Sequence, residues 1–273
     1  MQVKSNQTKE PTWDAEFYYD NSRPQFEAAQ RLIRQISFQG NEHILDVGCG
    51  DGKISAVLTK KVPKGRVVGI DPSQSMIDFA KKTFPVSKYS SLEFFRLMAE
   101  EITFQEEFDL VVSFTALHWS RDIPAVLAGI SRALKRKGKF YLTVPASLGS
   151  RFYEAVSQTI STERWKRYFD NFIRPVTLLS DTEYSQLLAK QNLQPLSVQT
   201  FPLSYRFEDA EELKNWLLGH SSFLTPIPQP LRSHFISDLV AIFMNHQIGR
   251  PQPVFYDETR TEIHAEKLEP LHD

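Results

Sequence analysis

The sequence contains a single cysteine, Cys49, among its 273 residues. One thiol cannot build a disulfide framework or a metal site with several cysteine ligands, so neither is expected. Long apolar runs are also missing. There is no apolar stretch of about 18 residues and no hydrophobic segment of a signal peptide, and the polar segment 1–10 is predicted to be a frayed tail. We therefore expect a cytoplasmic protein that does not act in a membrane.

The chain also lacks an excess of charge of one sign, because its formal net charge is −1. No broad basic field is available to recruit nucleic acid, and the short lysine clusters fall at predicted helix ends, where water solvates them. The histidines other than His118 have no mutual spacing typical of a metal site, so no metal is expected and none of them is given a role. The composition, with 41% hydrophobic and 24% charged residues, is that of one globular domain spanning 1–273.

A glycine-rich turn is the most informative feature that is present. An apolar segment at 43–47 runs directly into Gly48, Gly50 and Gly52, and a helix is predicted to follow. Glycine permits a tight turn and a close approach of the backbone to a ligand. The next strand-like run, 66–70, ends in Asp71, about twenty residues after the glycines, where a carboxylate can accept both hydroxyls of a ribose. The pair of signals predicts a nucleotide-type cofactor site.

The spacing of the glycines argues against a pyrophosphate cofactor, since Lys53 stands where a nicotinamide-binding chain would place its third glycine. Together with Asp46, the segment 71–76 (DPSQSM) and the segment 108–113 (FDLVVS), the turn resembles the class I S-adenosylmethionine-dependent methyltransferases. The resemblance implies S-adenosylmethionine as the cofactor.

The resemblance also implies where the cofactor is held. The backbone of Gly48, Cys49 and Gly50 is expected at its methionine part, with Asp46 orienting the turn. Asp71 is expected on the ribose, and Pro72 and Met76 against the adenine. The remaining residues expected to bind the cofactor are Tyr18, Arg23, Met98, Ala99 and Ser113. Met98–Ala99 departs from the family, which often has an acidic residue before the alanine. Met98 can pack on adenine but cannot accept a hydrogen bond from its amino group.

The hydrophobic periodicity predicts alternating strands and helices. Strands are expected near 43–47, 66–70, 92–96, 108–113 and 139–145, with a helix at 26–36 before them and a turn at 137–139 before the fifth. A further strand is expected at 195–203 and a last one at 253–265. The short, continuously apolar strands favour a parallel sheet covered on both faces, that is, a doubly wound α/β fold. The segments 147–192 and 204–250 are predicted to be helical insertions, and the family resemblance implies that they cover the substrate.

The order of elements resembles the trans-aconitate and juvenile-hormone-acid methyltransferases in particular. The residues that carry this resemblance are 116–119 (ALHW), Tyr18 to Pro24, and Glu212 to Gly219 with the proline-rich segment after it. It implies a mostly parallel, Rossmann-like sheet of seven strands in the order 3-2-1-4-5-7-6, with a reversed last strand.

The acceptor site is expected after the fourth strand, at the carboxyl end of the sheet, where open α/β folds bind ligands. By the resemblance, His118 and Trp119 are expected to hydrogen-bond the acceptor carboxylate beside the methyl group. A structural role for both residues remains the alternative. The apolar insertion suggests a small or medium carboxylic acid with a hydrocarbon portion. A tricarboxylate would need several cations, and Arg151 and Arg174 are the only obvious candidates nearby.

Other functions stay open at this point. Methyl ester formation on a malonyl carrier protein is the nearest rival, followed by methylation of nitrogen, hydroxyl or carbon in another small molecule. A binding module without catalysis is disfavoured, because Asp46, the three glycines and Asp71 are intact.

Overall fold

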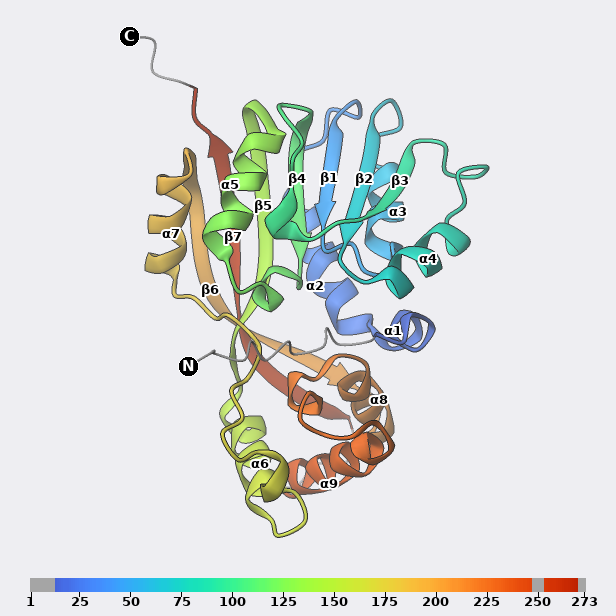
Figure 1. Cartoon of the computed structure of the whole chain (residues 1–273), viewed down its shortest axis with the longest axis vertical. Helices are drawn as coiled ribbons and strands as arrows, with labels where there is room; N and C mark the ends of the chain where they lie inside the picture. The colour runs from blue at the N-terminus through green and yellow to red at the C-terminus, as the bar shows by residue number, and fades with distance from the viewer. Residues whose placement is uncertain (1–12, 247–252, 270–273) are drawn as a thin grey trace, which may run out of the picture.

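The computed structural model describes residues 13–246 and 253–269, and it has one seven-stranded sheet (Figure 1). The strands are β1 (His43–Val47), β2 (Arg66–Asp71), β3 (Leu92–Arg96), β4 (Phe108–Phe114), β5 (Leu134–Leu148), β6 (Leu193–Phe207) and β7 (Val254–Lys267). Their order is β3-β2-β1-β4-β5-β7-β6, and β7 runs antiparallel to both of its neighbours. This confirms the predicted fold class, strand order and reversed last strand.

Helices cover both faces of the sheet because successive strand residues point to opposite sides. In β1, Ile44 packs with helices α2 (Arg23–Ile33), α3 (Lys53–Thr59) and α4 (Gln74–Thr83). Its neighbour Leu45 packs on the other face, with α5 (Ile123–Ala133) and α7 (Asp181–Lys190). The strands are therefore buried on both sides, as their continuous apolar sequence predicts.

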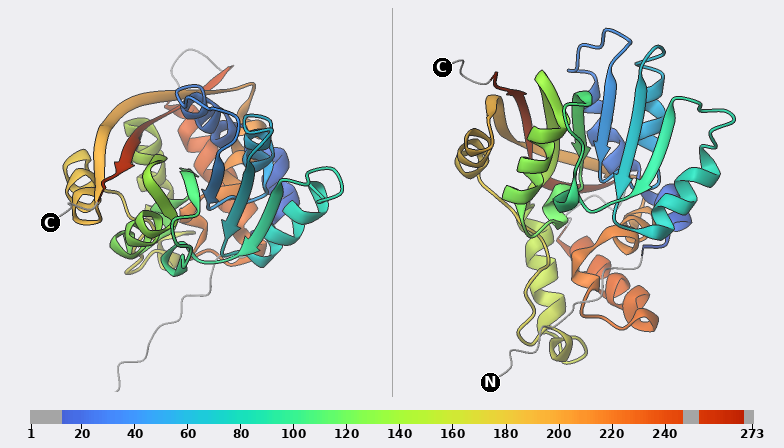
Figure 2. Two further views of the ribbon diagram at one scale, coloured as in Figure 1. Left: turned by 90° about the horizontal axis from the view of Figure 1, so that it is seen from above. Right: turned by 45° about the horizontal axis from the view of Figure 1, so that its top comes forward.

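A second hydrophobic core lies below the sheet in Figure 1. It joins the long β5, β6 and β7 to α6 (Ser150–Ser161), α8 (Ala210–His220) and α9 (Arg232–Asn245). The short helix α1 (Ala15–Asn21) packs beside α8 and α4. The second view in Figure 2 shows α6 and α9 standing off the end of the sheet at which its parallel strands finish. The insertions thus form a lobe at the carboxyl ends of the strands, where ligands bind in such folds.

Three expectations about the elements were wrong in detail. The turn predicted at 137–139 before the fifth strand lies inside it. Strand β5 already begins at Leu134, and Lys137, at φ 59°, lies in an irregular part of it beside β4. The first long helix covers Arg23–Ile33 rather than 26–36, since Pro24 lies in its first turn, where the missing N–H costs nothing. Helix α7 lies within the segment 147–192 but packs on the sheet, so it does not cover the pocket.

The predicted frayed tail, 1–10, falls outside the described residues. Within 13–246 and 253–269, no helix is both long enough and apolar enough to cross a bilayer.

Candidate active site

The glycine turn after β1 is tied to the end of β2 by its own amides. Gly48 and Cys49 donate to the carbonyl of Ile70 at 2.8 and 3.0 Å, and Gly50 donates to Oδ2 of Asp71 at 3.0 Å. These hydrogen bonds use the three N–H groups, so the turn offers a ligand its carbonyls and its bare glycine surface. The contact of this backbone with the cofactor stays a prediction.

Gly48 cannot be replaced without disturbing this turn. Its φ is +77°, and a Cβ there would lie 2.2 Å from the Cβ of Ala116, which follows β4. The glycine therefore lets the turns after β1 and β4 touch. Cys49 beside it is buried, and burial raises the pKa of its thiol well above the usual value, which makes it a small packing residue rather than a nucleophile.

Three buried carboxylates surround the turn and give it a negative potential. Asp71 accepts from Gly50 with one oxygen and from the Ser73 amide, at 2.9 Å, with the other. Asp51 accepts from the Lys53 amide at 2.9 Å through Oδ1, while its buried Oδ2 has no hydrogen-bond partner in the described structure. Such a site favours a cation and hydroxyl groups and repels a pyrophosphate.

Asp46 is the most deeply placed of the three. It accepts from the Ser55 hydroxyl at 2.6 Å, which ties the end of β1 to helix α3. Burial, together with the charges of Asp71 and Asp51, raises its pKa to about 7, although the Ser55 bond works in the opposite direction. Asp46 thus fixes the end of β1, where the turn begins, to helix α3. A nearby cation would favour the charged form of its carboxylate.

The expected adenine contacts lie around the start of α4. Met76 is buried in the first turn of that helix, and the Pro72 carbonyl accepts from Nε of Arg96 at 2.9 Å. Met98 keeps 39% of its surface exposed, whereas Ala99 packs against the sheet core. The exposed Met98 is therefore available to a flat ligand.

The N-terminal segment crosses the carboxyl ends of β2 and β4. The Trp13 carbonyl accepts from the Ser75 hydroxyl at 2.9 Å, and the Trp13 ring meets Trp119 and Tyr18 edge-on at 5.5 and 5.9 Å between centroids. Burial, with Asp51 and Asp71 nearby, raises the pKa of the Tyr18 phenol. Trp13 thus connects the start of α4, on the cofactor side, to Trp119 on the acceptor side.

Lys53, which stands in place of a third glycine, joins the cofactor turn to this segment. Its ammonium donates to the Tyr19 carbonyl at 2.5 Å and lies 4.0 Å from the Tyr19 ring centroid. Lys53 therefore connects the cofactor turn to helix α1, a structural role that the glycine pattern did not predict.

Two residues expected at the cofactor are engaged elsewhere. Arg23 donates to Glu212 at 2.9–3.0 Å and to Glu27 at 2.8 Å on the protein surface, which does not support its expected contact with the cofactor carboxylate. Ser113 is fully buried and donates to the Val47 carbonyl at 2.7 Å. Its role is to join β4 to β1, because its only hydroxyl proton is used there.

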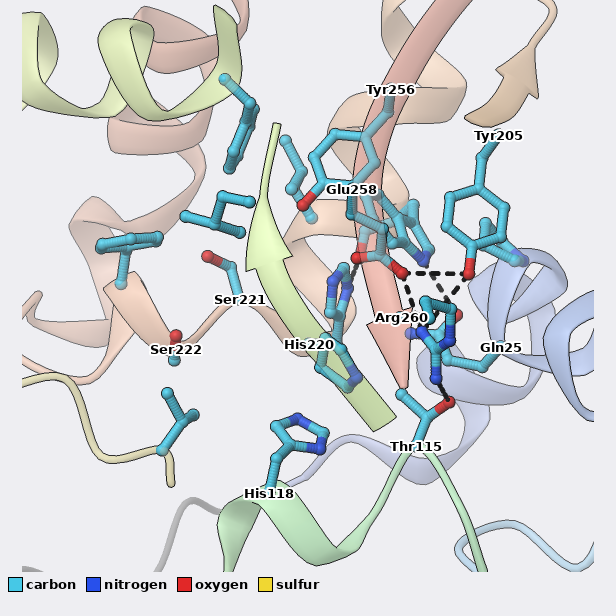
Figure 3. A pocket seen from close by; sticks show the side chains of 18 of the residues that line it. Gln25, Thr115, His118, Tyr205, His220, Ser221, Ser222, Tyr256, Glu258 and Arg260 are labelled. Carbon is cyan, nitrogen blue, oxygen red and sulfur yellow. Dashed lines mark hydrogen bonds and ion pairs between the residues drawn. The ribbon is translucent and has the colours of Figure 1, made fainter. Parts of the chain in front are cut away.

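His118 and Trp119 line a pocket between the sheet and the lobe (Figure 3). The pocket encloses about 580 Å³, counting the open space at its mouth. The turn that carries both residues is fixed from the lobe side, since the Thr177 amide donates to the His118 carbonyl at 2.7 Å. Burial lowers the pKa of His118 well below its usual value, and Arg260 and Arg174 add to this effect. His118 is therefore neutral at physiological pH.

A charged network forms one wall of this pocket. Arg260, only 3% exposed, donates to Glu258 at 2.8 Å and to the Thr115 hydroxyl at 2.6 Å. The Tyr205 hydroxyl donates to the same Glu258 oxygen at 3.1 Å. Glu258 and Arg260 are two residues apart on β7 and so share one face of the strand. Their charges compensate each other, and Arg260 adds no net charge to the pocket.

Gln25 presents an oriented amide to the pocket. The Trp216 indole, which can only donate, bonds to the Gln25 side chain at 2.8 Å, so the facing atom is the amide oxygen. The NH₂ group then points away from Trp216. It has no hydrogen-bond partner in the described residues and is available to an acceptor oxygen.

His220, which was given no role from the sequence, is brought to the pocket by the fold. Its ring lines the pocket, lies 4.1 Å from the Trp216 ring at an interplanar angle of 40°, and bonds through Nδ1 to the Trp216 carbonyl at 2.6 Å. Burial is the main cause that lowers its pKa to about 4. Because a carbonyl only accepts, Nδ1 carries the proton in this bond.

Of the two predicted cations, the structure brings only Arg174 to the pocket. Arg151 pairs with Asp257 on the surface and does not line it. Gln25 and Arg260 were missed because their sequence positions carry little signal. Gln25 is one polar residue in an amphipathic helix, and only the charge pair two residues apart on a predicted strand could have drawn attention to Glu258 and Arg260.

The residues at the cofactor turn fit S-adenosylmethionine. The buried carboxylates suit its positive charges, Asp71 ends β2 where a ribose is expected, and the unpartnered Oδ2 of Asp51 can accept from a ligand donor. In the described residues no cluster of three metal-binding side chains accompanies this site.

Comparisons with known proteins agree with this geometry. Residues 44–138 match the model of a methyltransferase domain. The chain is 26% identical over 247 residues to the juvenile hormone acid O-methyltransferase of Bombyx mori, covering 83% of this chain and 86% of the relative. It is 24% identical over 229 residues to the trans-aconitate 2-methyltransferase of an Acidovorax species, covering 82% and 86%.

A solved structure shares the fold. The phosphoethanolamine N-methyltransferase 2 of Haemonchus contortus, in complex with S-adenosylhomocysteine, superposes with a TM-score of 0.59 at 17% identity, over 89% of this chain and 53% of that one. Domain, relatives and cofactor turn together lead to one conclusion. Residues 44–138 form a methyltransferase domain, and the relatives and the cofactor turn support an S-adenosylmethionine-dependent methyltransferase.

Proposed function

We propose that this methyltransferase forms the methyl ester of a small or medium, partly apolar carboxylic acid. The observation that carries the proposal is the Gln25 amide, whose donor group is oriented into the pocket by Trp216. A carboxylate oxygen is the acceptor that such a fixed donor favours. The indole of Trp119 and neutral His118 are further donors that line the pocket.

The chemistry requires little from the protein beyond alignment. The bound cofactor supplies a methyl group already activated by the positive sulfonium. A carboxylate is ionised at neutral pH, so its oxygen forms the new bond to carbon without losing a proton. The electron pair of the broken sulfur–carbon bond remains on sulfur. Gln25 and Trp119 orient the carboxylate for this in-line displacement.

The pocket wall also suits a hydrocarbon portion of the acceptor. Apolar side chains from both the sheet and the lobe face it, namely Leu148, Phe152, Val176, Leu217 and Phe223. Two of the relatives are named for carboxylic acids, juvenile hormone acid and trans-aconitate, which supports the same acceptor group.

The other acceptors considered from the sequence need different features. An amine, hydroxyl or carbon acceptor usually requires a base, and the neutral His118 would be the group available for it. A malonyl carrier protein would need a docking surface for its acidic partner, and a non-catalytic module would bind the cofactor without turnover. The cytoplasmic location stays a prediction from the sequence.

A panel of carboxylic acids, amines, alcohols and a malonyl carrier protein, incubated with labelled cofactor and analysed by mass spectrometry, tests the proposal. We expect methyl esters of small acids. Gln25→Leu should lower kcat/KM by about 10- to 100-fold, the scale of one hydrogen bond to a charged group, while calorimetry shows unchanged cofactor affinity. Glu27→Gln, on the exposed side of the same helix, is the matched control.

Transfer to nitrogen, hydroxyl or carbon instead of carboxylate would overturn the proposal. So would cofactor binding without turnover across the whole panel.

A further inference from the structure

Arg174 lies in the segment between α6 and α7 and reaches the pocket from the lobe. Its Nε donates to the Ser222 hydroxyl at 2.7 Å, and its guanidinium lies 5.1 Å from the centroid of the Phe223 ring. These two contacts hold the side chain in place through its Nε edge and one flat face. The rest of the guanidinium is left to face other groups.

In the described part of the chain, Arg174 is a cation without an ion pair, and the charge of Glu258 reaches it only beyond ion-pair distance. Among residues 13–246 and 253–269, no carboxylate forms an ion pair with Arg174, and its two terminal nitrogens make no hydrogen bond. Arg260, the other arginine of the pocket, is compensated by Glu258 at 2.8 Å. Partial burial lowers the pKa of Arg174 and outweighs the opposite effects of Tyr256 and Glu258, so keeping the charge there has a net cost. A buried cation of this kind is stabilised by an anionic ligand.

The free guanidinium is separated from Gln25, the donor that carries the assignment of the reacting carboxylate. Figure 3 shows Ser222, the partner of Arg174, on the opposite side of the pocket from Gln25 and Thr115. Thr115 precedes Ala116, which touches the cofactor turn at Gly48, so Gln25 lies on the cofactor side. Arg174 therefore faces the end of an acceptor that is remote from the methyl group.

We propose that the natural acceptor is a dicarboxylic acid, one of whose carboxylates binds Arg174 while the other is methylated beside Gln25. This inference rests on the proposed function and narrows its substrate class. The planar fork of an arginine matches a carboxylate with two parallel hydrogen bonds. One uncompensated charge matches one carboxylate, because both pocket histidines are neutral at physiological pH. The product is a half-ester that keeps its charge at Arg174.

The apolar side chains of the pocket wall limit which acids can bind. Leu148, Phe152, Val176 and Leu217 suit a hydrocarbon spacer rather than a third charged group. A tricarboxylate would place an unpaired charge against these side chains, which is unfavourable. The pocket should therefore prefer a dicarboxylate to a monocarboxylate of equal length and to a tricarboxylate.

Turnover of matched acids by the wild-type protein tests this. Straight-chain α,ω-dicarboxylates from succinate to sebacate are compared with monocarboxylates of equal length and with the corresponding mono-methyl esters. For the best chain length, kcat/KM for the dicarboxylate should exceed that for the monocarboxylate by about tenfold or more, the effect of a charge-assisted hydrogen-bond pair. The mono-methyl ester should fall to the level of the monocarboxylate.

Variants then assign the preference to Arg174. Arg174→Met should abolish it by raising KM for dicarboxylates only, and Arg174→Lys should restore part of it. Arg151→Met, which removes a surface arginine paired with Asp257, should leave it unchanged.

The outcomes separate this inference from the proposed function. Equal turnover of monocarboxylates and dicarboxylates by the wild type would overturn the dicarboxylate assignment and leave ester formation standing. An equal loss for both acids in Arg174→Met would overturn it too, since Arg174 would then hold the reacting carboxylate. Failure of every carboxylic acid would instead remove the proposed function itself.

Discussion

Arg260 donates to the hydroxyl of Thr115 at 2.6 Å and so connects the last strand to the turn after β4. Thr115 has a φ of +55°, a left-handed conformation that is costly for a β-branched residue. The contact with Arg260 and the bond from the Thr115 amide to the Thr143 carbonyl, at 2.7 Å, hold it there. Arg260, on the last strand, thereby holds the turn that carries His118 beside the pocket.

Removing Arg260 alone should destabilise the protein strongly, because Glu258 would remain as an unpaired buried charge. We expect Arg260→Met to lower the free energy of unfolding by about 3–5 kcal/mol. The double variant Arg260→Met with Glu258→Met should recover most of that loss. Denaturant unfolding of the three proteins measures both effects. A double variant as unstable as the single one would show that the pair is not coupled.

Gly48→Ala should damage the cofactor site far more than Gly50→Ala. Both glycines have positive φ, 77° and 53°, but a Cβ on Gly48 would lie 2.2 Å from Ala116, while a Cβ on Gly50 meets nothing within 4 Å. We expect Gly50→Ala to cost about 1 kcal/mol of stability, the penalty of a left-handed conformation. Gly48→Ala adds a steric clash to that cost and should abolish cofactor binding in calorimetry. Equal affinity in the two variants would contradict this account of the turn.

The buried Asp46 should make stability depend on pH between about 4 and 7. Its pKa rises from 3.8 to about 7 on folding, so in this range the native state binds a proton that the unfolded state does not. Stability from this group therefore falls as the pH rises, by up to about 4 kcal/mol. Asp46→Asn cannot ionise and should lose that slope. Unfolding free energies at about pH 5 and pH 8 measure the difference between the two proteins, and parallel slopes would count against the raised pKa.

Turnover of a carboxylic acid should stay nearly flat from about pH 6 to 8, since the acceptor is already ionised. The pKa of His118 lies well below its usual value, so this residue does not titrate in that range either. Chelators should have no effect, because the described residues hold no cluster of metal ligands. A rate that rises with an apparent pKa near 6.5, and loses this rise in His118→Ala, would instead indicate a base and a different acceptor. Inhibition by EDTA would contradict the expected absence of a metal.

Much of the fold was predictable because it follows from local patterns. The apolar run 43–47, the glycines after it and the acidic end of 66–71 are short-range signals, and each element formed where its own residues favour it. The parts that were wrong depended on neighbours. Lys137 could not be placed in a strand irregularity without knowing that β5 pairs with β4 there, and α7 could not be assigned to the sheet without its packing partners.

In the active site, too, local sequence patterns predicted one part, and the packing of distant segments decided the other. The sequence by itself determined the class of cofactor, because glycines that turn a strand into a helix and an acidic residue at the next strand end are a local arrangement. Only the tertiary structure decided the acceptor pocket, where Gln25, Arg174 and Arg260 come from three distant segments. Arg260 forms an ion pair with Glu258, whereas Arg174 forms none in the described residues. Which of the two happens depends on the residues that fold beside each arginine. That relationship has no fixed spacing along the chain.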